Sequence, residues 1–247
     1  MSCCSSNPKD LGDCPICLLP FPNITPTDEG DVIYIVYDCC SKLVCDGCVQ
    51  ANSRREVEAS LLPSCPFCRH HPLPTTEAEG YLLKMKRAEM NDPVALHDVG
   101  VDHSKSGDIA TAIKYFKKAA ELGHAESHYQ LSVFYIEGRG LEKDMKKFVY
   151  HLEQAAIGGH SVARHNLGAW EGRKGNDGRA VKHYTIAANL GFDVSLEALK
   201  KYYARGMVSR EDFAAVIRQH QAALDATKSP QRHEAKMNRK VHGECFQ

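Results

Sequence analysis

The chain has 247 residues, 43% of them hydrophobic, which is enough for one or two domains with hydrophobic cores. Lysine and arginine together number 31, as do aspartate and glutamate, so the formal net charge is zero. This balance argues against a protein that binds nucleic acid mainly through its phosphates, because such binding needs a basic surplus.

The amino-terminal segment, MSCCSSNPKD, is polar and lacks the apolar run of a signal peptide. We expect residues 1–13 to form a flexible terminus. No stretch of the chain approaches the roughly 18 consecutive apolar residues that a membrane-spanning helix needs, so we expect no membrane partner. These features predict a cytoplasmic or nuclear protein.

Eight of the eleven cysteines lie between Cys14 and Cys68. In a reducing compartment, such a cluster indicates metal binding rather than disulfides. Six of them form three C-x2-C pairs, in which the two intervening residues let both thiolates point at one tetrahedral ion. The other two, Cys39 and Cys40, are adjacent, and they bring the number of ligands to the eight that two zinc ions need. The segment therefore predicts two zinc ions bound by cysteine alone.

The same segment holds signals for one strand and one helix. "VIYIVYD", residues 32–38, is rich in β-branched and aromatic residues and predicts a strand. The residues after Cys48 have helical composition. Zinc must supply much of the stability of such a small module, because it has few large apolar residues.

The cysteine layout resembles the RING finger, in which the first and third ligand pairs bind one zinc ion and the second and fourth pairs bind the other. The resemblance implies a RING-like module over residues 14–71 with two sets of ligands. These sets are Cys14, Cys17, Cys45 and Cys48 for site 1, and Cys39, Cys40, Cys65 and Cys68 for site 2.

The second pair departs from the common RING pattern. Lys42 stands where the family usually has a zinc-binding histidine, and lysine is protonated at neutral pH. Cys39 then takes the place of the histidine. An alternative is that His70 or His71, just after Cys68, completes site 2 in place of one member of the doublet.

RING fingers commonly act as ubiquitin ligases: they bind a ubiquitin-loaded conjugating enzyme and orient its thioester, with no covalent intermediate. The resemblance implies that Ile16, Pro66 and Arg69 contact that enzyme and ubiquitin. The tryptophan that many active members carry in the groove is replaced here by Leu61 and Leu62. The alternative is a non-catalytic, zinc-dependent adaptor.

Two other classes receive little support. Residues 14–68 contain seven acidic and three basic residues, which disfavours a zinc module that binds a polyanion. A thiol enzyme would need a basic partner near Cys3 or Cys245, and none stands at a recognisable spacing. Most of the 13 histidines occur singly on helical stretches, where we expect surface or packing roles.

After a linker and a helix over residues 72–90, the chain repeats itself. Alanine doublets begin at Ala119, Ala155 and Ala187, in steps of 36 and 32 residues, and a glycine follows each at the same interval. A period of this size predicts a solenoid of paired helices, in which the alanines permit close approach and each glycine ends a helix. Leu131, Leu167 and Leu199 recur as expected core residues.

This pattern resembles the Sel1-like repeats, which are related to tetratricopeptide repeats, over residues 91–224. The resemblance implies an all-α solenoid whose surface binds a protein substrate or partner. Residues 225–247 have few large apolar side chains and are expected to form a flexible tail. The sequence thus predicts a zinc-stabilised RING-like module followed by an all-α solenoid.

Overall fold

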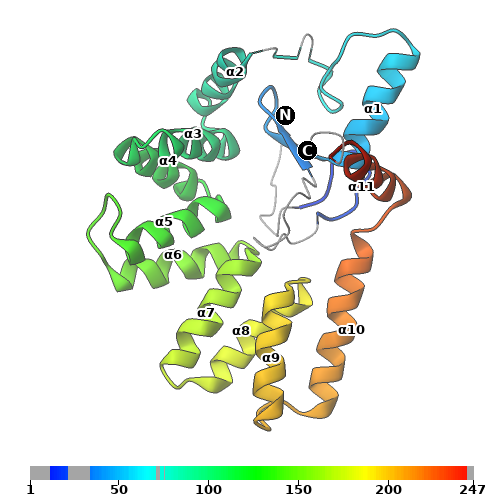
Figure 1. The fold of residues 1–247 in the computed structure, drawn as a ribbon. Helices are drawn as coiled ribbons and strands as arrows, with labels where there is room; N and C mark the ends of the chain where they lie inside the picture. The colour runs from blue at the N-terminus through cyan, green and yellow to red at the C-terminus, as the bar shows by residue number, and fades with distance from the viewer. Residues whose placement is uncertain (1–11, 22–33, 71–72, 75, 244–247) are drawn as a thin grey trace, which may run out of the picture.

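The computed structural model describes residues 12–21, 34–70, 73–74 and 76–243, which contain two strands and eleven helices (Figure 1). The strands are β1, Tyr34–Tyr37, and β2, Lys42–Cys45. The helices are α1 Asp46–Glu58, α2 Glu77–Glu89, α3 Pro93–Lys105, α4 Ile109–Glu121, α5 Ala125–Glu137, α6 Met145–Ile157, α7 Ser161–Arg173, α8 Asp177–Asn189, α9 Asp193–Ala204, α10 Arg210–Ala226 and α11 Pro230–Gly243. None of these helices is both long and apolar enough to cross a bilayer.

The amino-terminal module is built on a β-hairpin. β1 and β2 pair antiparallel with Tyr34 opposite Cys45, and α1 begins directly after β2. The predicted strand is confirmed for Tyr34–Tyr37. Phe21 and Val44 are buried beside three of the cysteines and form the small apolar core of the module. Of the predicted flexible terminus, residues 1–11 lie outside the described part of the chain.

Helices α2–α10 form an arc in which each helix packs against the next (Figure 1). α3 and α4, α5 and α6, and α7 and α8 form three hairpins, and α9 and α10 both pack against α8. Separate clusters of buried apolar residues lie between these elements. The predicted all-α solenoid is therefore confirmed.

The repeated small residues have the roles that their spacing predicts. Both alanines of every doublet are buried, and so are the recurring leucines. The glycines that follow the doublets have left-handed backbone, with φ of +83° at Gly123, +90° at Gly159 and +86° at Gly191. A residue with a side chain is strained in this conformation, so glycine suits the sharp turn between consecutive helices.

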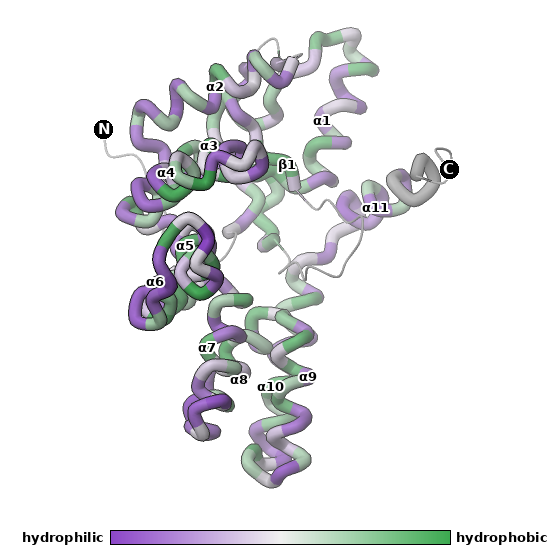
Figure 2. Tube along the Cα trace, turned by 60° about the vertical axis from the view of Figure 1, so that its left-hand side comes forward, coloured by the Kyte–Doolittle hydropathy of each residue, from purple (hydrophilic) through white to green (hydrophobic). Residues whose placement is uncertain are grey.

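The carboxyl-terminal segment differs from its prediction as a flexible tail over residues 225–247. α10 continues to Ala226, and α11 forms and packs against α1, which returns the end of the chain to the amino-terminal module (Figure 1). α11 is mostly hydrophilic (Figure 2). Its sequence therefore lacks the apolar residues from which a packed helix is usually predicted. Its contact with α1 is largely polar: the Gln50 side-chain amide, for example, donates to the Ala235 carbonyl oxygen at 3.3 Å.

Candidate metal centre

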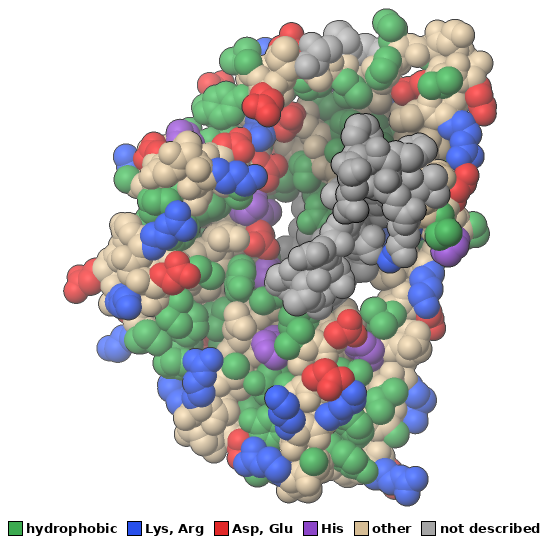
Figure 3. All heavy atoms as spheres, in the orientation of Figure 1, with side chains coloured by type: hydrophobic (Ala, Val, Ile, Leu, Met, Phe, Trp, Pro, Cys, Tyr) green, Lys and Arg blue, Asp and Glu red, His purple; other side chains and the backbone are tan. Residues whose placement is uncertain are grey.

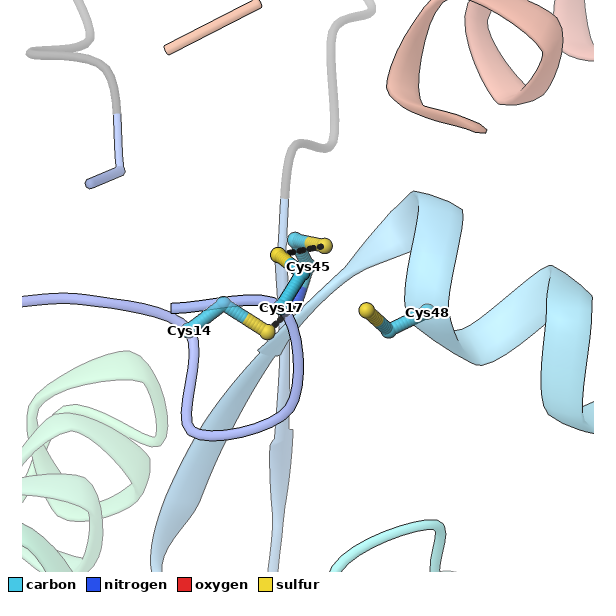
Figure 4. A group of neighbouring side chains, drawn as sticks. All are labelled: Cys14, Cys17, Cys45 and Cys48. Atoms are coloured by element: carbon cyan, nitrogen blue, oxygen red, sulfur yellow. Dashed lines mark hydrogen bonds between the residues drawn. The ribbon is translucent and has the colours of Figure 1, made fainter. Parts of the chain in front are cut away.

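The first cysteine group joins a loop to the start of α1. Cys14 and Cys17 lie in the loop of residues 12–21, Cys45 ends β2, and Cys48 lies in the first turn of α1 (Figure 4). The four sulfur atoms lie within 4.8 Å of one another, and the Cys17 and Cys45 sulfurs are 3.7 Å apart. The amide of Leu18, whose φ is +58°, donates to the Cys14 carbonyl oxygen at 2.8 Å, and this turn directs both loop cysteines to one point.

The second cysteine group joins the hairpin turn to the loop after α1. It consists of Cys39, Cys40, Cys65 and Cys68, whose sulfur atoms also lie within 4.8 Å of one another. The Cys39 and Cys68 sulfurs are 3.5 Å apart, and the Cys40 and Cys65 sulfurs are 3.8 Å apart. Both members of the doublet thus face the last C-x2-C pair.

The two loop pairs share one backbone arrangement. The Arg69 amide donates to the Cys65 carbonyl oxygen at 2.9 Å with φ of +60° at Arg69, which repeats the geometry of Leu18 and Cys14. His70 is not a member of the second group, and His71, the other alternative ligand, lies outside the described residues. Lys42 Nζ lies 5.9 Å from the centre of the Phe67 ring, between the two cysteines of the last pair in sequence.

The donor sets fit a tetrahedral zinc ion. A zinc–sulfur bond of about 2.3 Å places the sulfurs of such a site about 3.8 Å apart, close to the separations observed here. All eight cysteines are free, and their sulfurs are much farther apart than the roughly 2.05 Å of a disulfide. The structure thus brings the predicted ligands together in the two predicted groups.

Burial and crowding in the two groups disfavour the ionised form of several of these thiols. Burial raises the pKa of Cys40 to about 12, and burial also raises the pKa of Cys48. Against the opposing effect of burial, backbone amides of Cys17 and Cys45 lower the pKa of Cys14 to about 7. Four packed thiols resist ionising together, and a divalent cation offsets that repulsion because it binds the thiolates.

Glu56 of α1 anchors the loop that carries the last cysteine pair. Its carboxylate is buried and accepts hydrogen bonds from the Ser64 amide at 3.1 Å and the Ser64 hydroxyl at 2.6 Å. Because Ser64 directly precedes Cys65, these bonds fix where the second group begins. Nothing in the spacing of the cysteines identifies Glu56 as an anchor.

The three residues proposed to contact a conjugating enzyme lie in different environments. Ile16 is 41% exposed at the first cysteine loop, whereas Pro66 is buried. Arg69 is exposed, and its guanidinium donates to the Asn52 side-chain oxygen on α1 at 2.8 Å.

α2, at one end of the arc, and α11, which follows its other end, each contact the surroundings of one cysteine group. At the second group, Arg87 of α2 donates to the Ser41 hydroxyl at 3.0 Å, and Lys84 Nζ lies 3.9 Å from the carboxylate of Asp38. Asp38 and Ser41 flank the cysteine doublet. At the first group, Arg232 of α11 donates to the Cys17 sulfur at 3.7 Å.

Arg232 is a site residue that sequence reasoning missed. It lies 215 positions from Cys17, and no motif or spacing connects them. Although burial acts in the opposite direction, hydrogen bonds to the thiols of Cys45 and Cys17 raise the pKa of Arg232. Its charge is therefore held beside the sulfurs.

Comparisons with known proteins identify the helical part. The Sel1 repeat family model matches residues 93–124, 125–160 and 161–192, that is, α3–α4, α5–α6 and α7–α8 with their turns. No RING or zinc-finger family model matches the cysteine-rich segment.

Two curated relatives share part of this sequence. DAP3-binding cell death enhancer 1 of Mus musculus is 30% identical over 184 residues, which are 58% of this chain and 36% of that protein. Chitin synthase regulator SKT5 of Saccharomyces cerevisiae is 35% identical over 103 residues, which are 40% of this chain and 15% of that protein. The chain thus spans about a third or less of the length of these relatives.

A solved structure supports the same architecture. The Sel1 repeat protein from Oxalobacter formigenes has a TM-score of 0.51 at 22% identity, with 62% of this chain and 66% of that chain covered. At this identity, the likeness concerns the fold alone. Together with the hairpins seen here, the matches show that residues 93–192 are three Sel1 repeats.

Proposed function

We propose that this chain is a zinc-dependent adaptor that binds a protein partner on its Sel1 repeats. The observation that carries the proposal is the stack of hairpins from α3 to α8, which presents a continuous, rigid surface of the kind that solenoids use to bind proteins. The names of two relatives, DAP3-binding cell death enhancer 1 and chitin synthase regulator SKT5, describe action on other proteins.

An apolar face on α6 suits such a partner. Tyr150 and Ile157 are 53% and 70% exposed, and their spacing of seven residues puts them on the same side of the helix, two turns apart. Exposed apolar residues that share a face contribute more to protein binding than scattered ones.

The amino-terminal module contributes two zinc ions in this proposal. Cys14, Cys17, Cys45 and Cys48 would hold one ion, and Cys39, Cys40, Cys65 and Cys68 the other. Closed sets of four cysteines are typical of structural zinc, which stabilises a fold and leaves no open position for substrate. Free thiols at this density fit a reducing compartment, the cytosol or the nucleus.

Native mass spectrometry tests the metal assignment. We expect two zinc ions per wild-type chain, one in Cys14→Ser and one in Cys65→Ser. Cys245→Ser, outside the eight-cysteine segment of the sequence, serves as the control and retains two. A wild-type chain that binds no zinc, or variants that lose neither ion, contradicts the assignment.

Capture after crosslinking in cells, followed by calorimetry with each purified candidate, tests the adaptor role. We expect a partner that binds the full chain with micromolar or tighter affinity. The double substitution Tyr150→Lys and Ile157→Lys should weaken binding at least tenfold, whereas Val194→Lys, at an exposed apolar residue of α9, should not. Partner binding that needs only the amino-terminal module would contradict the role of the repeats.

Ubiquitin ligase activity is the second candidate, favoured by the exposure of Ile16 and Arg69 at the two cysteine loops. The test is discharge of ubiquitin to free lysine from a panel of loaded conjugating enzymes. Faster discharge that is lost in both Ile16→Ala and Arg69→Ala, with two zinc ions retained, would make the ligase the leading function. The adaptor proposal expects no acceleration.

A further inference from the structure

The guanidinium of Arg232 is bound by the loop that carries the first cysteine pair. Its Nη1 donates to the Pro20 carbonyl oxygen at 2.6 Å, and its Nη2 donates to the Leu19 carbonyl oxygen at 2.9 Å and to the Cys17 sulfur at 3.7 Å. The guanidinium carbon lies 5.6 Å from the centre of the Phe21 ring. One side chain of α11 thus contacts four of the five residues from Cys17 to Phe21, namely Cys17, Leu19, Pro20 and Phe21.

Contacts with residues just before α11 and at its start also orient Arg232. Nη1 also donates to the Thr227 carbonyl oxygen at 2.8 Å, and the Arg232 amide donates to the Ser229 hydroxyl at 3.1 Å at the start of α11. The planar, multi-donor head of arginine suits this role, because it satisfies several carbonyl oxygens in a fixed geometry.

The backbone of α11 sits directly against α1. A Cβ atom built on Gly47 would lie 2.9 Å from the Arg232 amide nitrogen and 2.9 Å from the Gln231 carbonyl carbon. Gly47 immediately precedes Cys48, so α11 seats at the turn of α1 that supplies a cysteine of the first group. Ala235, one turn further along, is buried in the same contact.

The charge of Arg232 complements a metal-loaded first group. Four thiolates around a divalent cation carry a net charge of about −2, and groups that hydrogen-bond to the ligands tune how tightly the metal is held. Within the described part of the chain, the Arg232 guanidinium lies against a sulfur of the first group, at 3.7 Å from Cys17.

We propose that Arg232 is a positioning residue for the first cysteine group and that metal binding there and docking of α11 on α1 strengthen each other. This inference rests on the proposed zinc function and deepens it. A metal-ordered loop presents the Leu19 and Pro20 carbonyl oxygens to Arg232, and docked Arg232 in turn holds the loop in the metal-binding arrangement. Coupling of this kind is reciprocal by thermodynamic necessity.

Pulse alkylation of the zinc-loaded full chain, with each cysteine quantified by mass spectrometry, tests whether Arg232 protects the metal in the first group. At a fixed chelator concentration, Arg232→Gln should speed alkylation of the first group by about 10- to 100-fold, the usual effect of losing such a contact. The second group should be unchanged. Arg232→Lys, which keeps the charge, should restore part of the protection; a lysine variant no better than glutamine contradicts the charge argument.

Gly47→Ala provides an independent variant that leaves Arg232 intact. Alanine raises the helix propensity of α1 by about 1 kcal/mol, yet its Cβ displaces α11, so the first group should again lose protection. Arg54→Gln serves as the matched control: it removes the exposed Arg54–Glu234 ion pair between α1 and α11 and should have little effect.

Hydrogen exchange tests whether bound metal in turn stabilises the docking of α11 on α1. Removing zinc from the wild-type chain should speed exchange of the amides of α11, and restoring zinc should slow it again. A wild-type chain that binds no metal overturns both the zinc function and this inference. A chain that binds two ions, but whose first-group protection is the same in wild type, Arg232→Gln and Gly47→Ala, overturns this inference alone.

Discussion

Histidines of the repeats cap helices and pack against one another. The His124 side chain accepts a hydrogen bond from the Ser127 amide at the start of α5, and His160 accepts one from the Ala163 amide at the start of α7. His160 Nε2 also lies 2.7 Å from the Glu126 carboxylate. Several histidine side chains lie near the centre of the face shown in Figure 3, and others lie at its edge. The packing role expected from the sequence is confirmed for these residues.

The capping histidine of α5 makes stability depend on pH. Burial, followed by the charge of His97, lowers the pKa of His124 from 6.5 to about 4, so the folded chain keeps this ring neutral. Between these two values the unfolded chain takes up a proton that the folded chain does not. The free energy of unfolding therefore falls as pH drops from about 6.5 to 4.

The substitution His124→Asn isolates this effect, because asparagine caps a helix well but does not titrate. Urea unfolding at several pH values should give a smaller loss of stability between pH 6.5 and 4 for the variant than for wild type. Burial also lowers the pKa of His151 to about 4. His151 should therefore maintain part of the pH dependence of stability in the variant. Identical pH dependence in both proteins would contradict the role of His124.

Glu56 offers a residue-level test of the second cysteine group. Glu56→Ala removes the carboxylate oxygen that accepts both hydrogen bonds from Ser64 and should lower the free energy of unfolding of the module by about 1–3 kcal/mol. The second group should release zinc sooner than the first in a chelator titration. Glu58→Ala, at an exposed position of the same helix, is the control; equal effects of the two substitutions would show that the loop does not depend on Glu56.

At the scale of elements, the hairpins depend on their buried leucines. Leu152 of α6 is fully buried in a cluster with Tyr135 and Leu167 from the flanking helices. Leu152→Ala should lower the free energy of unfolding by about 2–5 kcal/mol, as measured by urea denaturation. Ile157→Ala, on the exposed face of α6, should cost much less. Similar losses would mean that the exposed face is as tightly packed as the core.

The sequence predicts elements well where a repeat imposes regular spacing. Ala119, Gly123 and Leu131 recur in register, so one pattern, read several times, predicts helix ends and core together. α11 lacks such a signal because its docking depends on polar contacts such as that of Gln50 with Ala235. Polar contacts between distant segments leave no periodicity in the chain.

At the scale of the molecule, zinc removal should separate the two parts. With a chelator, residues 14–21 and 34–70 should lose protection from hydrogen exchange, because metal-binding energy supplies much of the folding energy of this module. α3–α10 should keep theirs, since their cores lie between helices. Far-ultraviolet circular dichroism should retain most of its helical signal. A uniform loss of protection along the chain would mean that the repeats also depend on the metal.

The candidate site is predictable only as far as local chain geometry determines it. C-x2-C spacing directs two sulfurs to one point, and the doublet follows from counting ligands, so the two groups agree with the sequence. The role of Arg232 cannot be predicted in this way, because its position beside Cys17 depends on the curvature of the whole arc. The environment of Pro66 likewise depends on how the loop after α1 folds back, which spacing alone does not specify.

The contact between α11 and α1 constrains the number of helical hairpins that the arc can contain. In an open solenoid, a gained or lost hairpin lengthens or shortens the array and leaves the other contacts intact. Here both ends of the arc meet one small module, through Arg87 at Ser41 and through Arg232 at Cys17. Loss of a single hairpin would carry α11 away from Gly47 by a full step of the stack. The arc can therefore accept many substitutions along its length, but its closure admits only one count of hairpins.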